Sequence, residues 1–550
     1  MKSILWRLST LVTAGLLLTT TVRANIYATD IKLNGARNPV TGIPPLTNSI
    51  SYILNEPATL GTTVNILSGT NIVRAISLGV GTNGTWLGSN YVIWDSNDNN
   101  SNSVPTGNYV ISVTPAAIGY SNWTQISRDT NPGNFALQPR GLAIDNNSNS
   151  LYYGRIFLGN AQGADAAVAP NPTPGSNDTI LKLNADCSFS DDGPYGDGGY
   201  VIYDTGSADL PEKLRLGDDD RLYMNDFSSY GQIVAFNTLL STNEVVLSAD
   251  NYSANPVFFN NFQDFGWFSF DVTSAGADDG LIWLGDGDTN GAGIWNWHLT
   301  NGIADPNDTS GNLAIPLGGG LTSISGGLIV DTNLDIFIGQ YLTDSGDTNP
   351  CCMVFTNWNS GSAFTNGTPT TNGLAWSDAN ILGVCDVSID SRQKPKYVAC
   401  SLNGATTTNG VRILNALTGA TVTNLDSPNQ YYVAAWDNVG NLYAGTGSAH
   451  RLRVFSPPDG TNQATTLAII KVEPEILHIT NNRTNVVIEF LASRSDLVGD
   501  FSLVGAPAVT GPFRVVAGPT VAALGNGLFT VTAAPPSVDT FYQILRNPTP

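Results

Sequence analysis

A repeated pattern fills the middle of this 550-residue chain and limits what the chain can fold into. From about Ile126 to Ile470, an apolar run leads into Asp or a polar turn, and a second apolar run ends in Gly or a small residue. Short apolar runs bounded by turn residues are typical of β-strands in hairpins. The pattern occurs in six segments, most of them followed by a further apolar run: 140–154, 212–226, 267–286, 326–340, 385–401 and 431–447.

The spacing of these segments gives repeats of roughly 50–60 residues, a period that is typical of propeller blades in all-β proteins. One hairpin of this kind cannot bury its apolar face, whereas blades stacked around an axis bury both faces and leave short protected edges. The pattern therefore predicts a central β-propeller of about six blades, with seven as the alternative count. A solenoid would need shorter and more regular repeats.

The composition extends the all-β interpretation to the rest of the chain. Only 13% of the residues are charged, and 57 Gly and 30 Pro residues are dispersed between apolar runs, as in short strands joined by many turns. A chain of this length is too long for a single hydrophobic core. We expect four parts: a signal peptide at 1–24, a β-sandwich at 25–125, the β-propeller at 126–470 and a small β-sandwich-like module at 471–550.

The N-terminal segment has the features of a secretory signal. Lys2 and Arg7 form a positive region, an apolar core of signal-peptide length runs from Leu8 to Leu18, and Val22 and Ala24 are the small residues that a signal peptidase requires. We expect cleavage after the last of these and a mature protein that is secreted or held at the cell surface. A buried N-terminal helix is the alternative, although nothing amphipathic follows to dock it.

Five residues of the first β-region form a recognisable constellation. A strand ends in Trp94 and Asp95, a polar turn follows, and Pro105, Gly107 and Tyr109 open the next strand. This arrangement resembles the immunoglobulin-like domain of the FlgD family of flagellar hook-capping proteins, although Ser and Asn replace the glycines that are usual in its polar turn. The resemblance implies an immunoglobulin-like sandwich. It does not imply a flagellar role, because one fold carries many functions.

The C-terminal stretches 486–516 and 529–546 are similar to a β-module of large secreted proteins of the Verrucomicrobia and related bacteria. The order of signal, FlgD-like domain, propeller and C-terminal module resembles an uncharacterised exported family from that group. The resemblance spans most of the chain and implies an architecture. It implies no activity.

The five cysteines fit an exported protein that does not depend on a disulfide framework. Cys385 and Cys400 bracket a hairpin, and a turn centred midway between them would place them directly opposite each other, within disulfide reach. We therefore predict a Cys385–Cys400 disulfide. For Cys351 and Cys352, a strained vicinal disulfide and two free thiols on opposite sides of a strand both remain open, and Cys187 has no obvious partner.

One turn has the spacing of a partial calcium loop. Asp286, Asp288 and Asn290 stand at alternate positions and Gly291 follows, so that three oxygens could face a hard cation. The twelfth position holds Trp297 instead of the usual Glu. Calcium is the metal that this pattern fits, and solvated turn residues are the alternative interpretation.

A pair of tryptophans is the second candidate for ligand binding. Trp295 and Trp297 project from one face of a strand, because side chains alternate along it with a period of two. Such a pair can stack on sugar rings or on the apolar surface of a partner. Packing between blades is the alternative, and it is the commoner fate of large aromatic residues.

Charge and motif content exclude several classes of function. The net charge is −21 with no basic cluster beyond the N-terminus, and such a field repels nucleic acids and anionic membranes. No later stretch is apolar enough to span a bilayer. The three histidines, His298, His450 and His478, do not lie in a nucleophile-type context, and glycine-rich phosphate loops are absent. The oligomeric state has no sequence signal.

These features favour an exported, non-enzymatic binding or scaffold protein that uses the propeller as a recognition platform for a carbohydrate or a protein. One alternative is a hydrolase that acts on a sugar or lactone, with carboxylates holding a divalent metal at the channel mouth, as in propellers that resemble gluconolactonase. Another is a structural component of the cell surface. Three or more Asp, Glu, Asn or His side chains converging on the central channel would favour the enzyme.

Overall fold

The architecture is all-β throughout the part of the chain that the structure, a computed structural model, describes. It contains β-strands, short 3₁₀ turns at Pro132–Asn134 and Val498–Asp500, and no α-helix. The predicted signal peptide lies outside the described residues, which are 25–37, 47–160, 179–192, 211–226, 232–248, 269–274, 280–286, 293–300, 303–304, 312–318, 320–342, 349–356, 374–378, 381–390, 392, 397–404, 409–472, 474–481, 484–510, 512–534 and 541–547.

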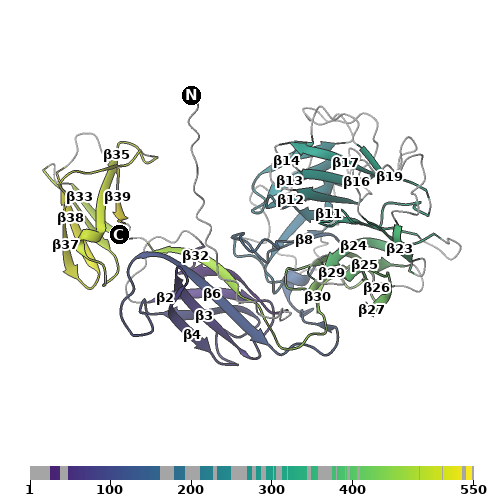
Figure 1. Ribbon diagram of the computed structural model, residues 1–550, viewed down its shortest axis with the longest axis horizontal. Helices are drawn as coiled ribbons and strands as arrows, with labels where there is room; N and C mark the ends of the chain where they lie inside the picture. The colour runs from purple at the N-terminus through teal and green to yellow at the C-terminus, as the bar shows by residue number, and fades with distance from the viewer. Residues whose placement is uncertain are drawn as a thin grey trace.

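The repeated segments form six antiparallel sheets that radiate from a common axis (Figure 1). The first strand of each sheet is the innermost, and each innermost strand contacts the next around a closed ring, in which the sixth contacts the first. The protein therefore contains a six-bladed β-propeller, as the repeat period predicts. The innermost strands are β8 (Pro139–Ile144), β11 (Pro211–Leu216), β15 (Phe270–Ser274), β20 (Leu328–Val330), β24 (Val384–Asp390) and β28 (Tyr431–Trp436).

Each blade continues outward through hairpins of consecutive strands. In blade order the outer strands are β9 (Ile156–Asn160) and β10 (Thr179–Leu183); β12 (Arg221–Asp226), β13 (Gln232–Asn237) and β14 (Asn243–Ser248); β16 (Gly280–Asp286), β17 (Gly293–Thr300), β18 (Ile303–Ala304) and β19 (Asn312–Pro316); β21 (Ile336–Gly339), β22 (Cys352–Phe355) and β23 (Leu374–Asp378); β25 (Tyr397–Asn403), β26 (Asn409–Asn415) and β27 (Thr421–Leu425); β29 (Leu442–Thr446), β30 (Arg451–Ser456) and β7 (Thr124–Gln125).

The ring is closed by strand exchange between its two ends. Strand β7 precedes the first blade in the chain, yet it forms the outer edge of the sixth blade, where Gln125 pairs with Phe455 of β30. Backbone hydrogen bonds thus join the beginning of the propeller to its end. This pairing protects an edge strand that would otherwise be open.

The recurring Asp of the sequence pattern shapes the turn after the innermost strand. In five blades its carboxylate accepts a hydrogen bond from the backbone amide two residues further on, at 2.8 to 3.2 Å. Asp side chains commonly stabilise turns in this way. The five residues are Asp145, Asp219, Asp331, Asp390 and Asp437.

The N-terminal region is a two-sheet sandwich. Two of its strands come from the part of the chain that follows the propeller. Its core includes Tyr52, Trp94 and Tyr109, which are all fully buried. One sheet contains β1 (Ala28–Leu33), β2 (Asn48–Leu54) and β5 (Gly88–Trp94), and the other contains β4 (Asn71–Leu78), β3 (Gly61–Ser68), β6 (Gly107–Ala117), β31 (Asn462–Gln463) and β32 (Thr466–Val472).

Strands β31 and β32 both pair with β6, so the chain returns to the first sandwich after the sixth blade. The boundary that the sequence suggested at 470 is therefore too late, because the segment from Asn462 onward belongs to the sandwich. The apolar alternation of this segment equally fits a blade strand, and it does not encode the pairing partner.

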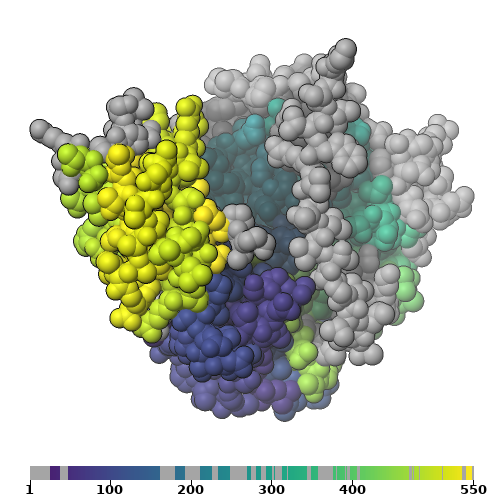
Figure 2. Space-filling view, turned by 60° about the vertical axis from the view of Figure 1, so that its left-hand side comes forward, coloured from purple at the N-terminus to yellow at the C-terminus, as the bar shows by residue number. Residues whose placement is uncertain are grey.

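The C-terminal module is a second small sandwich that lies against the first (Figure 2). Its core centres on Phe490, Phe501 and Phe529, whose rings lie 5.0 to 5.5 Å apart. At the contact with the first sandwich, Thr106 donates hydrogen bonds to the carboxylate of Asp496. The sheets are β33 (Glu475–Asn481), β34 (Val486–Leu491), β38 (Leu528–Ala533) and β37 (Thr520–Gly525), and β36 (Arg514–Val515), β35 (Phe501–Ala506) and β39 (Phe541–Arg546).

Candidate functional site

The central channel of the propeller has two chemically different ends. All innermost strands run in the same direction, since each is the first strand of its blade. They end at the Asp turns, which we call the Asp mouth. Near the opposite end lie Arg140, Glu212, Tyr341 and Tyr432, which we call the Tyr mouth.

Between the two mouths, buried ion pairs fill the channel. The guanidinium of Arg215 on β11 lies 3.2 Å from a carboxylate oxygen of Asp386 on β24 and 3.7 Å from one of Asp271 on β15. The ammonium of Lys213 lies 3.9 Å from Asp386 and donates a hydrogen bond of 2.8 Å to the carbonyl of Cys385. All four charged side chains are buried. Two cations from one blade thus neutralise two carboxylates from two other blades.

Backbone groups complete this network. Asp271 accepts a hydrogen bond of 2.7 Å from the amide of Val330, and Arg215 donates one of 3.1 Å to the carbonyl of Leu328. Both partners belong to β20, so the charged centre ties a further blade to the axis. Burial raises the pKa of Asp271 to about 6, and the neighbouring Arg215 opposes that shift. The network acts mainly as a structural closure of the channel.

The ion pairs in the channel help to assess the alternative function of a metal-dependent hydrolase. Carboxylates do converge on the channel, as that alternative requires, but their oxygens face Lys213 and Arg215 instead of one another. Among the described residues, no group of three or more His, Cys, Asp or Glu side chains could hold a metal ion. The observed geometry therefore does not favour a divalent metal at the axis.

The Tyr mouth presents aromatic surface beside a polar pair. Arg140 of β8 lies over the ring of Tyr432 of β28, 4.5 Å from its centroid, and 3.3 Å from a carboxylate oxygen of Glu212 of β11. Tyr341 follows β21 and is 36% exposed. Burial raises the pKa of Tyr341, with smaller contributions from Cys385 and Tyr432, so these groups share one environment.

The side chains at the Tyr mouth are suited to binding a ligand. The exposed ring of Tyr341 can stack on an apolar face of a ligand, and tyrosine hydroxyl groups can donate or accept hydrogen bonds. Arg140 and Glu212 add hydrogen-bond donors and acceptors beside the tyrosines. Ligand sites commonly combine apolar walls with a few well-placed polar groups. Sequence reasoning missed this site because its residues come from four blades.

The predicted disulfide between Cys385 and Cys400 is wrong. The structure places Cys400 opposite Val387, and the register shifts between Val384 and Asp386, where Cys385 lies. The register therefore centres the hairpin one residue later than the midpoint between the two cysteines. Cys385 itself lies at a β-bulge. All five cysteines are buried free thiols. For Cys352, a hydrogen bond with Cys400 and burial raise the pKa of the thiol.

The partial calcium loop is described only at its first residue. Asp286 ends β16 and pairs with Gly293 of β17, so the loop joins these two strands. Asp288 and Asn290 lie outside the described residues. Calcium binding at this loop therefore stays a prediction.

Of the two candidate tryptophans, Trp297 lies in the core between blades and Trp295 is partly buried against that core. On β17, the rings of Trp295 and Trp297 are stacked, with centroids 6.2 Å apart and planes at 23°. Trp297 is fully buried among apolar residues of the second and third blades, and Trp295 packs against the same cluster. An enclosed ring cannot stack on a sugar, so the geometry favours the packing interpretation for Trp297.

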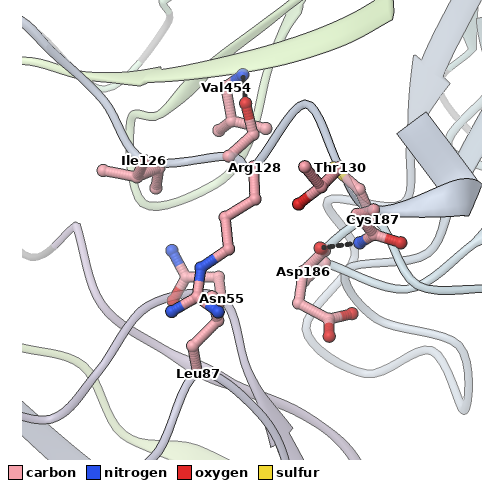
Figure 3. A pocket seen from close by; sticks show the side chains of 11 residues that line it. Asn55, Leu87, Ile126, Arg128, Thr130, Asp186, Cys187 and Val454 are labelled. Carbon is pink, nitrogen blue, oxygen red and sulfur yellow. Dashed lines mark hydrogen bonds between the residues drawn. The ribbon is translucent and has the colours of Figure 1, made fainter. Parts of the chain in front are cut away.

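A second hollow lies where the first sandwich meets the propeller (Figure 3). This cavity of about 280 Å³ is lined by Asn55 and Leu87 of the sandwich and by Arg128 and Asp186 of the propeller. Arg128 extends across it toward the sandwich residues (Figure 3). Asn131 shapes one wall by donating a hydrogen bond of 3.2 Å to the carbonyl of Asp186.

Comparisons with known proteins leave the family open. No protein-family model matches the sequence. No curated protein matches it. Within the described residues, no helix is both long and apolar enough for a membrane crossing.

The structure is remotely similar to solved propellers. For U3-55K the TM-score is 0.34 at 11% identity, with 62% of this chain and 100% of that chain covered. For the allergen Mala s 1 of Malassezia sympodialis it is 0.31 at 10% identity, with 62% and 96% covered. For Sqt1 of Saccharomyces cerevisiae it is 0.27 at 10% identity, with 76% and 100% covered. The propeller fold is assigned from the strand pairing and not from these similarities.

Proposed function

We propose that this protein is an exported, non-enzymatic carbohydrate-binding protein whose propeller is the recognition platform and whose Tyr mouth is the binding site. The observation that carries the proposal is the cluster at this mouth, where Arg140 lies over Tyr432 beside the partly exposed Tyr341. Flat aromatic faces flanked by charged hydrogen-bonding groups suit the alternating apolar and hydroxyl surfaces of a sugar ring.

The rigidity of the platform supports binding as its role. The ion pairs around Arg215 and the closure by β7 hold the six blades in one arrangement, so the side chains at the mouth are fixed before a ligand arrives. A preorganised site loses less conformational entropy on binding. By contrast, an acid–base mechanism needs a carboxylate free to exchange protons with a substrate, and Asp271 and Asp386 are enclosed in their ion pairs.

Export and attachment belong to the same proposal. Signal cleavage after Ala24 would deliver the protein to the cell surface or medium, and the two sandwiches would serve as spacers or attachment modules. Trp94 and Tyr109 pack edge to face in the core of the first sandwich, with centroids 6.0 Å apart. A surface module on a rigid spacer is suited to contact with extracellular glycans.

A glycan array tests this function. The mature protein should bind a restricted set of oligosaccharides, and Tyr341→Ala should weaken that signal. Tyr91→Ala is the matched control, because Tyr91 is 53% exposed on the first sandwich, far in sequence from the propeller. Repeating the array with EDTA separates a calcium-dependent site from the Tyr mouth. No binding to any glycan, or equal signals for both variants, would overturn the proposal and leave a protein ligand or a structural role.

A further inference from the structure

Residues 25–27, directly after the expected cleavage site, are enclosed between the first sandwich and the propeller. Asn25 is 1% exposed. Its carbonyl accepts hydrogen bonds of 2.8 Å from Asn55 of the sandwich and 2.9 Å from Asn441 of the sixth blade. Its side-chain amide donates to the carbonyl of Pro457 at 3.3 Å. The residue is therefore held from both sides.

The next two residues extend this anchorage. The amide of Ile26 donates to Asn462 at 3.3 Å, and the amide of Tyr27 donates to Asn55 at 2.9 Å. The ring of Tyr27 lies 5.5 Å from that of Tyr153 in the first blade. Exposed chain ends are usually mobile unless tied down. This segment is tied to both domains by side-chain and backbone contacts.

A buried carboxylate without a cation lies at the same junction. Glu56 is 2% exposed, and only its Oε2 accepts a hydrogen bond, from the hydroxyl of Tyr120 at 2.7 Å. Within the described part of the chain, its Oε1 has no hydrogen-bond partner and the carboxylate forms no ion pair. Burial raises the pKa of Glu56 to about 7, and the nearby Asp437 adds to the shift. An unpaired buried carboxylate is costly.

Three separate chains of contacts place Glu56 and Asn25 in the same junction. Glu56 follows Asn55, which binds the Asn25 carbonyl. Tyr120, which binds Glu56, pairs through its backbone with Pro458, next to the carbonyl that accepts from Asn25. Asp437, which acts electrostatically on Glu56, binds the same Asn441 side chain that donates to Asn25.

We propose that removal of the N-terminal segment after Ala24 creates an α-ammonium group on Asn25 that pairs with Glu56, and that this ion pair locks the first sandwich onto the propeller only in the processed protein. The inference rests on the proposed export. In the cleavage step, a signal peptidase adds water across the peptide bond between Ala24 and Asn25. The bond breaks to give a carboxylate on the former and an amine on the latter, which takes up a proton.

The experiment compares two N-termini in two backgrounds. One chain begins at Asn25, released from a cleavable fusion, and the other retains Arg23 and Ala24; each is made with Glu56 and with Glu56→Gln. The thermal midpoints are measured at pH 7. Glu56→Gln should lower the midpoint of the chain that begins at Asn25, because the ammonium loses its partner. It should raise the midpoint of the extended chain or leave it unchanged, because an unpaired buried charge is removed.

A second readout reports on the ion pair itself. The α-amino pKa of the chain that begins at Asn25, followed by NMR of the labelled terminus, should be at least one unit higher with Glu56 than with Glu56→Gln. That difference is a tenfold change in the protonation equilibrium. Equal thermal shifts in both backgrounds, together with an unchanged α-amino pKa, would overturn the inference.

Failure of export is recognised separately. Mass spectrometry of the protein recovered from a secreting host gives its first residue. If that residue is not Asn25, the predicted cleavage site fails, while the comparison of the purified chains still reports whether Glu56 binds a terminal ammonium.

Discussion

Removing Arg215 should destabilise the propeller far more than removing one partner of an ion pair on its surface. In Arg215→Met, the carboxylates of Asp271 and Asp386 would stay buried, and only Lys213, 3.9 Å from the latter, would remain as a cation. Breaking a buried ion pair by removing one partner costs about 3–5 kcal/mol. Because these groups are almost fully shielded from water, solvent screening should not reduce that cost appreciably.

The control is Glu244→Gln in the second blade. Glu244 lies 3.3 Å from Arg221, and its side chain is 54% exposed. Exposed pairs contribute about 0.2–1 kcal/mol. Urea unfolding followed by tryptophan fluorescence should therefore give a loss at least three times larger for Arg215→Met than for Glu244→Gln.

The deficit should also depend on pH. Burial already raises the pKa of Asp271 to about 6, and loss of Arg215 would raise it further. A carboxyl group whose pKa is raised in the folded state binds its proton more tightly there than in the unfolded state. The free energy of unfolding is therefore not reduced below the unfolded pKa of about 4, and it is fully reduced above the folded pKa. The deficit should therefore shrink as the pH falls from 7 to 4. A loss below about 1 kcal/mol, or a deficit that is independent of pH, would refute the closure role.

Two further outcomes follow from the structure. Since all five cysteines are buried and free, a thiol reagent should label none in the native protein and five per chain after denaturation; three or fewer would show that a disulfide forms. If the Asp286 loop binds calcium, added Ca²⁺ should raise the melting temperature and EDTA should reverse the rise, whereas Asp288→Asn should remove the response; an unmoved wild-type midpoint would dismiss the site.

The propeller could be predicted from the sequence because its repeats are local. In each blade an apolar run, a turn and a second apolar run follow one another directly in the sequence. The Asp residues occupy the turns that the pattern assigns to them. Pairings between distant segments carry no such signal. The closure of the sixth blade by β7, and the return of β32 to the first sandwich, depend on partners that alternation cannot specify.

The same reason explains the site. The prediction of a disulfide failed because the observed register places Val387, and not Cys385, opposite Cys400, and the sequence does not fix the centre of the turn that sets this register. Arg140 and Tyr432 lie in different blades, and nothing near either residue indicates that they meet. Trp297 is a large aromatic residue, and its side chain is fully buried between the second and third blades.

The most direct test of the account is the dissociation constant of an array-selected oligosaccharide for the wild-type protein and for Tyr341→Ala and Tyr91→Ala. An aromatic contact of about 0.5–1.5 kcal/mol corresponds to a two- to twelvefold change in affinity. We predict a loss of affinity of this size for Tyr341→Ala and unchanged affinity for Tyr91→Ala, with both variants as stable as the wild type. Unchanged affinity in Tyr341→Ala would contradict the claim that the Tyr mouth is the binding site.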